Sequence, residues 1–160
     1  AALAKDADRM QRALADMQAQ FASTTFASQA ALQAGKTLFD AGKLPEARAA
    51  LAWAAEKSSD DAYKAVARLR LAALDIEAQA YDQALKTLEA PVPKSFEPLV
   101  ADRRGDVVLA QGKADEAKAQ YQTAWKGLTN RTEYRRLVEV KLASLGVDVS
   151  TLAPTTEVAR

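Results

Sequence analysis

The amino-acid sequence predicts an all-α domain of about three repeated helix pairs, with an amphipathic helix before them and a capping helix after them. Residues that favour helices, alanine and leucine above all, are abundant, and β-branched residues are sparse. Apolar residues make up 49% of the 160-residue chain but aromatic residues only 6%, as expected for closely packed helices. A pattern of small residues also recurs along the chain, which indicates a repeat.

The composition excludes several classes of function. A formal net charge of +1 gives no general attraction to nucleic acid or to anionic lipid. The chain has no cysteine and no histidine, so it lacks thiolate chemistry, disulfides, the commonest metal ligand and the commonest general base. The sequence therefore predicts no cofactor and no metal, and a protein that is not an enzyme.

The first predicted helix spans residues 2–20. Its apolar residues follow one another at alternating steps of four and three, which is a heptad pattern. They are Leu3, Ala7, Met10, Leu14, Met17 and Phe21. This stripe either packs on the rest of the domain, or it binds a partner helix or continues a helix that lies upstream.

Two helix pairs are predicted next. Residues 23–25 provide hydroxyl groups that can cap a helix over residues 25–40, and Gly42 suits the left-handed end of that helix. Pro45 fits the first turn of the following helix, which ends near Ser58. Residues 58–61 cap a helix that runs to about residue 78, and its partner spans residues 81–90.

The third pair follows a linker, residues 91–95, that is predicted to be non-helical because of its two prolines. Pro98 opens a helix that ends at Gln111, and the second helix of the pair spans residues 114–127. Asn130 and Glu133 resemble a capping box for a last helix over residues 131–145. The domain organisation predicted is thus an N-terminal amphipathic helix (residues 1–23), a repeat domain (24–146) and a flexible tail (147–160).

The repeat is aligned on the alanine near the start of each second helix. These alanines are Ala47, Ala84 and Ala117, at spacings of 37 and 33 residues. A small residue lies twelve positions earlier (Gly35, Ala72, Gly105), and a turn lies five positions earlier (Gly42, Gln79, Gly112). Seven positions later come Ala54, Pro91 and Ala124. Small residues let helix backbones approach closely, so these positions are predicted to specify packing. The pattern resembles the tetratricopeptide repeat, and the stretch 101–124 preserves it best.

Residues 25–147 resemble a narrower family, that of the periplasmic domain of the bacterial ancillary Sec-translocon subunit (YfgM-like). The resemblance rests on residues 30–42, 66–72, 84–88, 101–106 with Gly112-Lys113, and 140–145. It implies a protein-interaction scaffold on the periplasmic side of the bacterial inner membrane, beside the Sec translocon. It also implies an upstream membrane anchor, from which the first helix would continue, and a membrane-anchored chaperone of the prolyl-isomerase type as partner.

The first helices of stacked pairs line a concave face. That partner-binding face is predicted to comprise Gln29, Leu32, Lys36, Phe39, Leu69, Ala73, Ile76, Glu77, Leu99, Asp102, Asp106 and Leu109. Most of these residues are apolar, which favours an apolar or amphipathic partner segment. Alternatively, the N-terminal helix or a curled-in neighbour fills the face. The pattern does not suit capture of a carboxylate terminus, because Asp102 and Asp106 would repel it.

A basic cluster surrounds the last helix. It comprises Lys126, Arg131, Arg135, Arg136 and Lys141. It is either the solvated outer side of a terminal repeat or a surface that binds RNA, lipid headgroups or an acidic partner. Trp53 and Trp125 are expected to fill the core between repeat units. Asp60 and Asp61 are adjacent on a helix and are predicted to be cap residues, because adjacent residues do not face each other.

Overall fold

The computed structural model describes residues 2–152, with the side chains of residues 2–7 excluded. The flexible tail that the sequence predicts falls partly on residues 153–160, outside the described residues. The chain divides into two compact units, unit 1 (Ala1–Pro93) and unit 2 (Lys94–Arg160). Among the described residues every regular element is a helix, which confirms the predicted all-α fold class.

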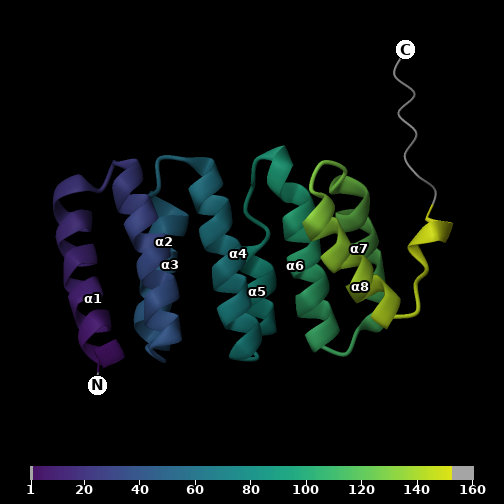
Figure 1. Cartoon of the computed structure of the whole chain (residues 1–160), viewed down its shortest axis with the longest axis horizontal. Helices are drawn as coiled ribbons and strands as arrows, with labels where there is room; N and C mark the ends of the chain where they lie inside the picture. Colours follow the sequence, from purple (N-terminus) through teal and green to yellow (C-terminus); the bar gives the residue numbers. More distant parts are fainter. Residues whose placement is uncertain (1, 153–160) are drawn as a thin grey trace, which may run out of the picture. The chain divides into compact units, whose positions relative to one another are not determined.

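Unit 1 contains five helices that lie side by side in chain order (Figure 1). They are α1 (Ala2–Phe21), α2 (Thr25–Asp40), α3 (Leu44–Lys57), α4 (Asp61–Glu77) and α5 (Tyr81–Thr87). Each packs on the next, and α2 also contacts α4. The core is built of alanine and leucine from α1 to α4, with Leu38 and Leu51 at its centre and Trp53 packed against it. Such a core follows from small residues that let the helices approach closely.

Unit 2 begins with a short 3-10 helix, η1 (Lys94–Phe96). It continues with α6 (Glu97–Ala110), α7 (Ala114–Gly127) and α8 (Thr132–Ser144), and a second 3-10 helix, η2 (Val149–Thr151), follows them. Here α6 packs on α7, and α7 packs on α8. Tyr121, Leu128, Val138 and Leu142 are among its largest fully buried side chains. The prediction that residues 91–95 contain no helical turn is wrong at its end, because η1 begins at Lys94.

The starts of the helices agree with their sequences except at one place. Thr24 caps α2 by accepting a hydrogen bond from the Ala27 backbone N–H (3.2 Å), and Asp60 caps α4 in the same way through Ala62 (2.7 Å). Pro45 and Pro98 lie in the first turns of α3 and α6. The predicted capping box before α8 does not form: the residue at the cap is Arg131, and no side chain caps the helix.

The ends of four helices, α2, α4, α6 and α8, share one geometry. Each is followed by a residue with a left-handed backbone, namely Gly42, Gln79, Gly112 and Gly146, with φ between 58° and 79°. At each end the next backbone N–H bonds to the carbonyl five residues earlier, over 2.8–3.0 Å. This is the Schellman arrangement, which satisfies the last free carbonyls of a helix. It turns the chain tightly at each of the three turns that the repeat predicts, and once more at Gly146.

Within the helix pairs, the predicted small residues lie where the two helices come closest. A Cβ atom built on Gly35 would lie 2.6 Å from the Leu51 side chain, and one built on Gly105 would lie 2.4 Å from the ring of Tyr121. Ala72 occupies the corresponding place in the second pair and is fully buried. The aligned alanines, Ala47, Ala54, Ala84, Ala117 and Ala124, are fully buried as well. A larger side chain at these positions would have to displace a neighbouring side chain or a helix.

Candidate protein-interaction surface

In unit 1, α2 and α4 carry the residues predicted to bind a partner. On α2, Gln29 and Lys36 are exposed and Phe39 is partly buried, whereas Leu32 is buried in the core. On α4, Leu69, Ala73 and Ile76 are partly buried and Glu77 is exposed. Leu32 is therefore a core residue that supports this face from below. The other seven residues keep solvent-accessible surface, both apolar and polar. In unit 1 the partner-binding face therefore stays a prediction.

Polar contacts connect α2 to α4. The Gln29 amide donates to the Tyr63 hydroxyl over 2.7 Å, and the Arg70 guanidinium donates to the Leu32 backbone carbonyl over 2.8 Å. Lys36 pairs with Asp40 one turn further along α2, at 2.5 Å. The Gln29 and Arg70 hydrogen bonds hold together the two helices that carry the predicted face. The Lys36 pair is exposed, so it contributes little to stability.

Helix α1 packs against α2, as one of the two interpretations of its heptad stripe predicts. Leu14 is buried in the unit 1 core, and Met10 packs against that core. Lys43 in the turn after α2 pairs with Asp8 of α1, and this pair lowers the pKa of the Asp8 carboxyl. Phe21, the last residue of the stripe, is half exposed. Leu3 and Ala7 lie outside the described side chains.

In unit 2, the predicted face differs from expectation. Leu99 is buried, and Asp102 is only 1% exposed, so neither can contact a partner. Asp106 is partly buried, and Leu109 is exposed. The expectation that Asp102 and Asp106 would lie on an open face and repel a carboxylate is therefore wrong for Asp102. Projection of the helix pattern could not reveal this, because the atoms that cover Asp102 come from α8.

A polar cluster joins α6, α7 and α8 around these two carboxylates. The Lys141 ammonium lies 2.8 Å from Asp102 Oδ1 and 2.7 Å from Asp106 Oδ1. The Tyr134 hydroxyl donates to Asp102 Oδ2 over 2.7 Å, and the Tyr121 hydroxyl donates to Asp106 Oδ1 over 2.9 Å. Buried charges persist only when they are paired and hydrogen-bonded, as they are here. The cluster therefore anchors α8 to the preceding helix pair.

The cluster also shifts the titration of its two tyrosines. Burial, reinforced by the carboxylate of Asp106, raises the pKa of the Tyr121 hydroxyl far above its usual range. Burial and the hydrogen bond to Asp102 raise the pKa of Tyr134 in the same direction. Each hydroxyl therefore remains protonated at neutral pH and acts as a donor to its carboxylate. These two hydrogen bonds help to hold α6, α7 and α8 together.

The basic cluster around the last helix is largely engaged within unit 2. The Arg135 guanidinium carbon lies 3.9 Å from the Trp125 ring centroid, that of Arg131 lies 5.9 Å from the Phe96 ring centroid, and Lys141 belongs to the polar cluster. Lys126 and Arg136 remain exposed. Trp125 itself is buried, and its indole N–H donates to Glu139 Oε1 over 2.9 Å. Among these five cations, Lys141 has its charge paired with carboxylates, and the ring contacts of Arg131 and Arg135 restrict the positions of their side chains.

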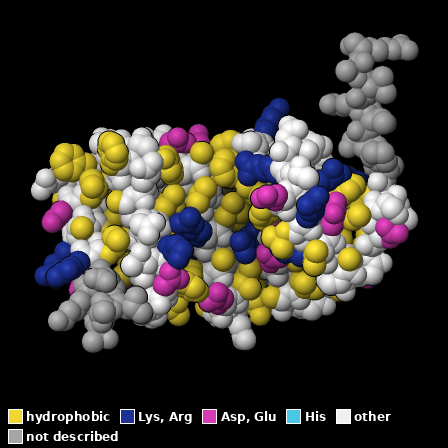
Figure 2. Space-filling view, in the orientation of Figure 1, with side chains coloured by type: hydrophobic (Ala, Val, Ile, Leu, Met, Phe, Trp, Pro, Cys, Tyr) yellow, Lys and Arg dark blue, Asp and Glu magenta, His cyan; other side chains and the backbone are white. Residues whose placement is uncertain are grey.

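Some surface features were not predicted from sequence. Phe21 and Phe26 are both exposed on either side of the turn between α1 and α2, and Leu137 and Val140 are exposed on α8. Hydrophobic side chains accordingly gather on the visible face over α1 and α2 (Figure 2). Asp75, which is fully buried and pairs with the partly exposed Arg48, also replaces the apolar residue that the other repeats place at this point of the first helix. Among the described residues there is no cluster of side chains suited to a metal and no helix long and apolar enough to cross a membrane.

Comparison with known proteins gives a family match. The model of the tetratricopeptide repeat-like domain matches residues 1–147. The chain is 34% identical over 132 residues to the ancillary SecYEG translocon subunit of Neisseria gonorrhoeae (strain ATCC 700825 / FA 1090). The aligned region covers 82% of this chain and 63% of that protein. It is 31% identical over 102 residues to the protein of the same name in Escherichia coli (strain K12), covering 64% and 50%.

A third relative of the same name, from Aggregatibacter actinomycetemcomitans, is 30% identical over 122 residues, covering 76% of this chain and 59% of the relative. The chain thus spans between half and somewhat under two thirds of the length of these relatives. No solved structure gave a significant match. These similarities confirm the resemblance that the sequence motifs indicated.

Proposed function

The chain belongs to the tetratricopeptide repeat-like domain family, and we propose that it is a non-enzymatic scaffold that binds other proteins. Tetratricopeptide-type helix pairs present extended faces to partner segments. The polar groups of unit 2 that could have served chemistry are instead engaged with one another in the cluster around Lys141. This supports binding over catalysis as the work of the domain.

The proposal extends to place and partners. The relatives carry the name of an ancillary SecYEG translocon subunit, and on that basis the chain serves the Sec translocon at the bacterial inner membrane. The family resemblance adds a periplasmic position, attachment through an anchor outside this chain, and a membrane-anchored chaperone of the prolyl-isomerase type as a second partner. In this arrangement residues 1–23 connect the anchor to the repeat domain, residues 24–146, and residues 147–160 form the tail.

One observation carries the choice of binding surface. Phe39 on α2 and Leu69, Ala73 and Ile76 on α4 are apolar, yet the structure leaves each of them partly accessible. Apolar groups that remain accessible on two contacting helices provide the burial that drives recognition of an apolar or amphipathic segment. The exposed polar residues beside them, Gln29, Lys36 and Glu77, would form the rim.

The test places a photo-crosslinking residue at Phe39, and separately at Leu69, in the full-length protein in cells. The expected result is a crosslink to a translocon subunit or to a periplasmic chaperone at both positions. The matched control is Leu44, an exposed apolar residue at the start of α3. Crosslinking that is equal at Leu44, or that is absent at Phe39 and Leu69, would exclude this face.

A substitution experiment separates binding from folding. The double variant Phe39→Asp/Leu69→Asp should weaken capture of the purified translocon by at least about tenfold, since charges would be placed in a desolvated contact. Its melting temperature is measured alongside, because Phe39 also packs against the core and Leu69 is partly buried. A folded double variant that binds as well as the unmodified chain would refute the proposed surface.

A further inference from the structure

Helix α8 has the properties of the first helix of a fourth pair. Gly146 follows it with the same left-handed backbone and the same hydrogen-bond pattern as the residues that follow α2, α4 and α6. Gly146 follows Gly112 by 34 residues (146 − 112), the spacing of a tetratricopeptide repeat. Within the described residues only the 3-10 helix η2 comes after it, where the other pairs have their second helix. The outer side of α8 carries Leu137 and Val140, which are exposed in the described part of the chain.

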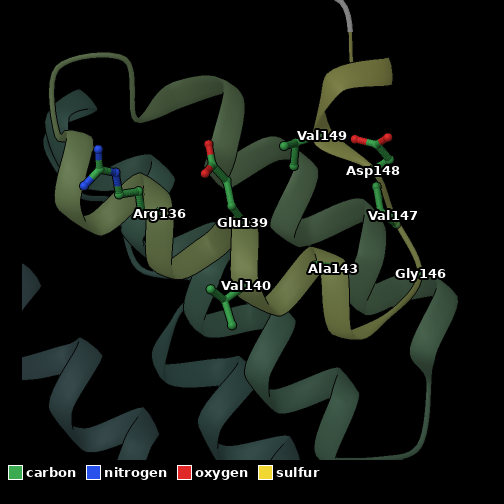
Figure 3. A pocket seen from close by; sticks show the side chains of 8 residues that line it. All are labelled: Arg136, Glu139, Val140, Ala143, Gly146, Val147, Asp148 and Val149. Carbon is green, nitrogen blue, oxygen red and sulfur yellow. The ribbon is translucent and has the colours of Figure 1, made fainter.

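This outer side is apolar at its centre. Leu137 is 50% exposed and Val140 is 66% exposed, and they lie three residues apart on one side of α8. Beside them, Val147 and Val149 from the segment after α8 line a surface hollow of about 700 Å³ together with Val140 (Figure 3). Terminal repeats usually present a polar outer side to water. The outer side of α8 instead has the character of an interface.

The two ends of the hollow carry opposite charges. Arg136 stands at one end and Asp148 at the other, with Val140 and Val149 between them (Figure 3). Arg136 is exposed and has no ion pair among the described residues, in contrast to Arg135, which stacks on Trp125. The hydrogen bond from Ser150 to Asp148 lowers the pKa of that exposed carboxyl, so it is ionised at neutral pH. The one other carboxylate of the hollow, Glu139, accepts from Trp125.

We propose that the outer face of α8 binds a second copy of this chain through a two-fold axis. In a two-fold contact the same patch meets itself in reverse, so the Arg136 end of one copy lies against the Asp148 end of the other. Each interface then contains two opposite-charge pairs around an apolar centre formed by Leu137, Val140 and Val149. A charge pattern with one sign at each end suits this self-pairing, whereas like charges at both ends would oppose it.

The test measures self-association by sedimentation velocity over a range of concentrations. The intact chain should show a monomer–dimer equilibrium, and Val140→Lys should raise its dissociation constant by at least about tenfold, because the new charge falls at the apolar centre. The matched control is Leu44→Lys, at a comparably exposed apolar residue of unit 1, which should leave the equilibrium unchanged. Circular dichroism of each variant verifies that it is folded.

Charge reversal tests the geometry itself. Arg136→Asp alone and Asp148→Arg alone should each weaken the dimer by about tenfold, because each creates two like-charge pairs across the axis. An equimolar mixture of the two variants should associate about as tightly as the unmodified chain, since every Arg then faces an Asp. A parallel contact, with position 136 against position 136, would instead make the mixture associate more tightly than the unmodified chain. A heterologous contact would form assemblies larger than a dimer, which sedimentation velocity separates from a dimer.

Three results would overturn the proposal. One is a chain that stays monomeric up to about 1 mM, where even a weak specific dimer would form. Another is a dimer that Val140→Lys does not weaken, because the contact would then lie elsewhere. The third is a dimer that appears only after residues 153–160 are removed, because the end of the same chain would then cover the face.

Discussion

Gly105 lies at the closest approach of α6 and α7. A Cβ atom added there would fall 2.4 Å from Cε1 of Tyr121, closer than two carbon atoms can lie without one moving. Tyr121 cannot move away easily, because its ring is 1% exposed and its hydroxyl is bonded to Asp106. The same contact in the first pair, between Gly35 and Leu51, involves only the branched end of a leucine. The third pair is therefore the less tolerant of the two.

Gly105→Ala should consequently lower the free energy of unfolding by about 1–3 kcal/mol, the usual range for overpacking. The sign of this change in the free energy of unfolding distinguishes the two effects. Without overpacking, alanine in a helix interior would stabilise the protein by about 0.5–1 kcal/mol relative to glycine. Urea denaturation followed by circular dichroism measures it. The control is a double-mutant cycle with Tyr121→Leu, which reproduces the Ala72–Leu88 combination of the second pair and should relieve part of the loss. An alanine that stabilises the protein would show that α6 and α7 are not packed this closely.

Among the elements, the second pair deviates from the others. At the end of α4 the left-handed position is occupied by Gln79, with φ of 58°, where the other three ends have glycine. A residue with a side chain is strained in this region by about 1 kcal/mol or more, whereas glycine is not. The second helix of this pair, α5, is also the shortest α-helix described, since it ends at Thr87 rather than at the predicted Ala90.

Gln79→Gly should therefore raise the free energy of unfolding by about 0.5–1 kcal/mol, because it relieves the strained backbone at a turn whose side chain is exposed. Thermal and urea denaturation both measure the change. The reverse substitution at an equivalent turn, Gly112→Gln, should destabilise by a similar amount, and nothing within 4 Å of that position obstructs the new side chain. If both substitutions destabilise, the turns are not equivalent and the repeat alignment at Gln79 is misplaced.

Local rules explain which elements the sequence predicted well. Hydroxyl and carboxylate caps at Thr24 and Asp60, the prolines in first turns, and glycine at helix ends are all determined by the nearest few residues. Two failures are local, at the capping box before α8 and at the start of η1, whereas the failure at the predicted binding face depends on distant residues. Asp102 was expected on an open face, yet Tyr134 and Lys141, more than thirty residues later, cover and neutralise it. Only the packing of α8 on the preceding pair brings these groups together, and no periodicity in α6 signals it.

For the whole molecule, the division into two units suggests how it unfolds. Unit 1 has its own core of alanine and leucine, and unit 2 has its own buried residues and its own polar cluster. In repeat proteins, stability is a sum of local terms and interfaces between neighbours, so a change within one unit is felt first in that unit. Each unit contains one tryptophan, Trp53 in unit 1 and Trp125 in unit 2, and these report the two units separately.

A pair of single-tryptophan proteins tests this independence. In Trp53→Phe the fluorescence reports unit 2, and in Trp125→Phe it reports unit 1; Gly105→Ala is then added to each. The urea midpoint seen by Trp125 should fall clearly, while the midpoint seen by Trp53 should fall by less than half as much, because the overpacked contact lies wholly in unit 2. Each comparison is made within one tryptophan background, since Trp125→Phe also removes the contacts with Glu139 and Arg135. Equal falls of both midpoints would mean that the chain unfolds as one cooperative body, and that partner binding at α2 and α4 would be coupled in full to the state of α8.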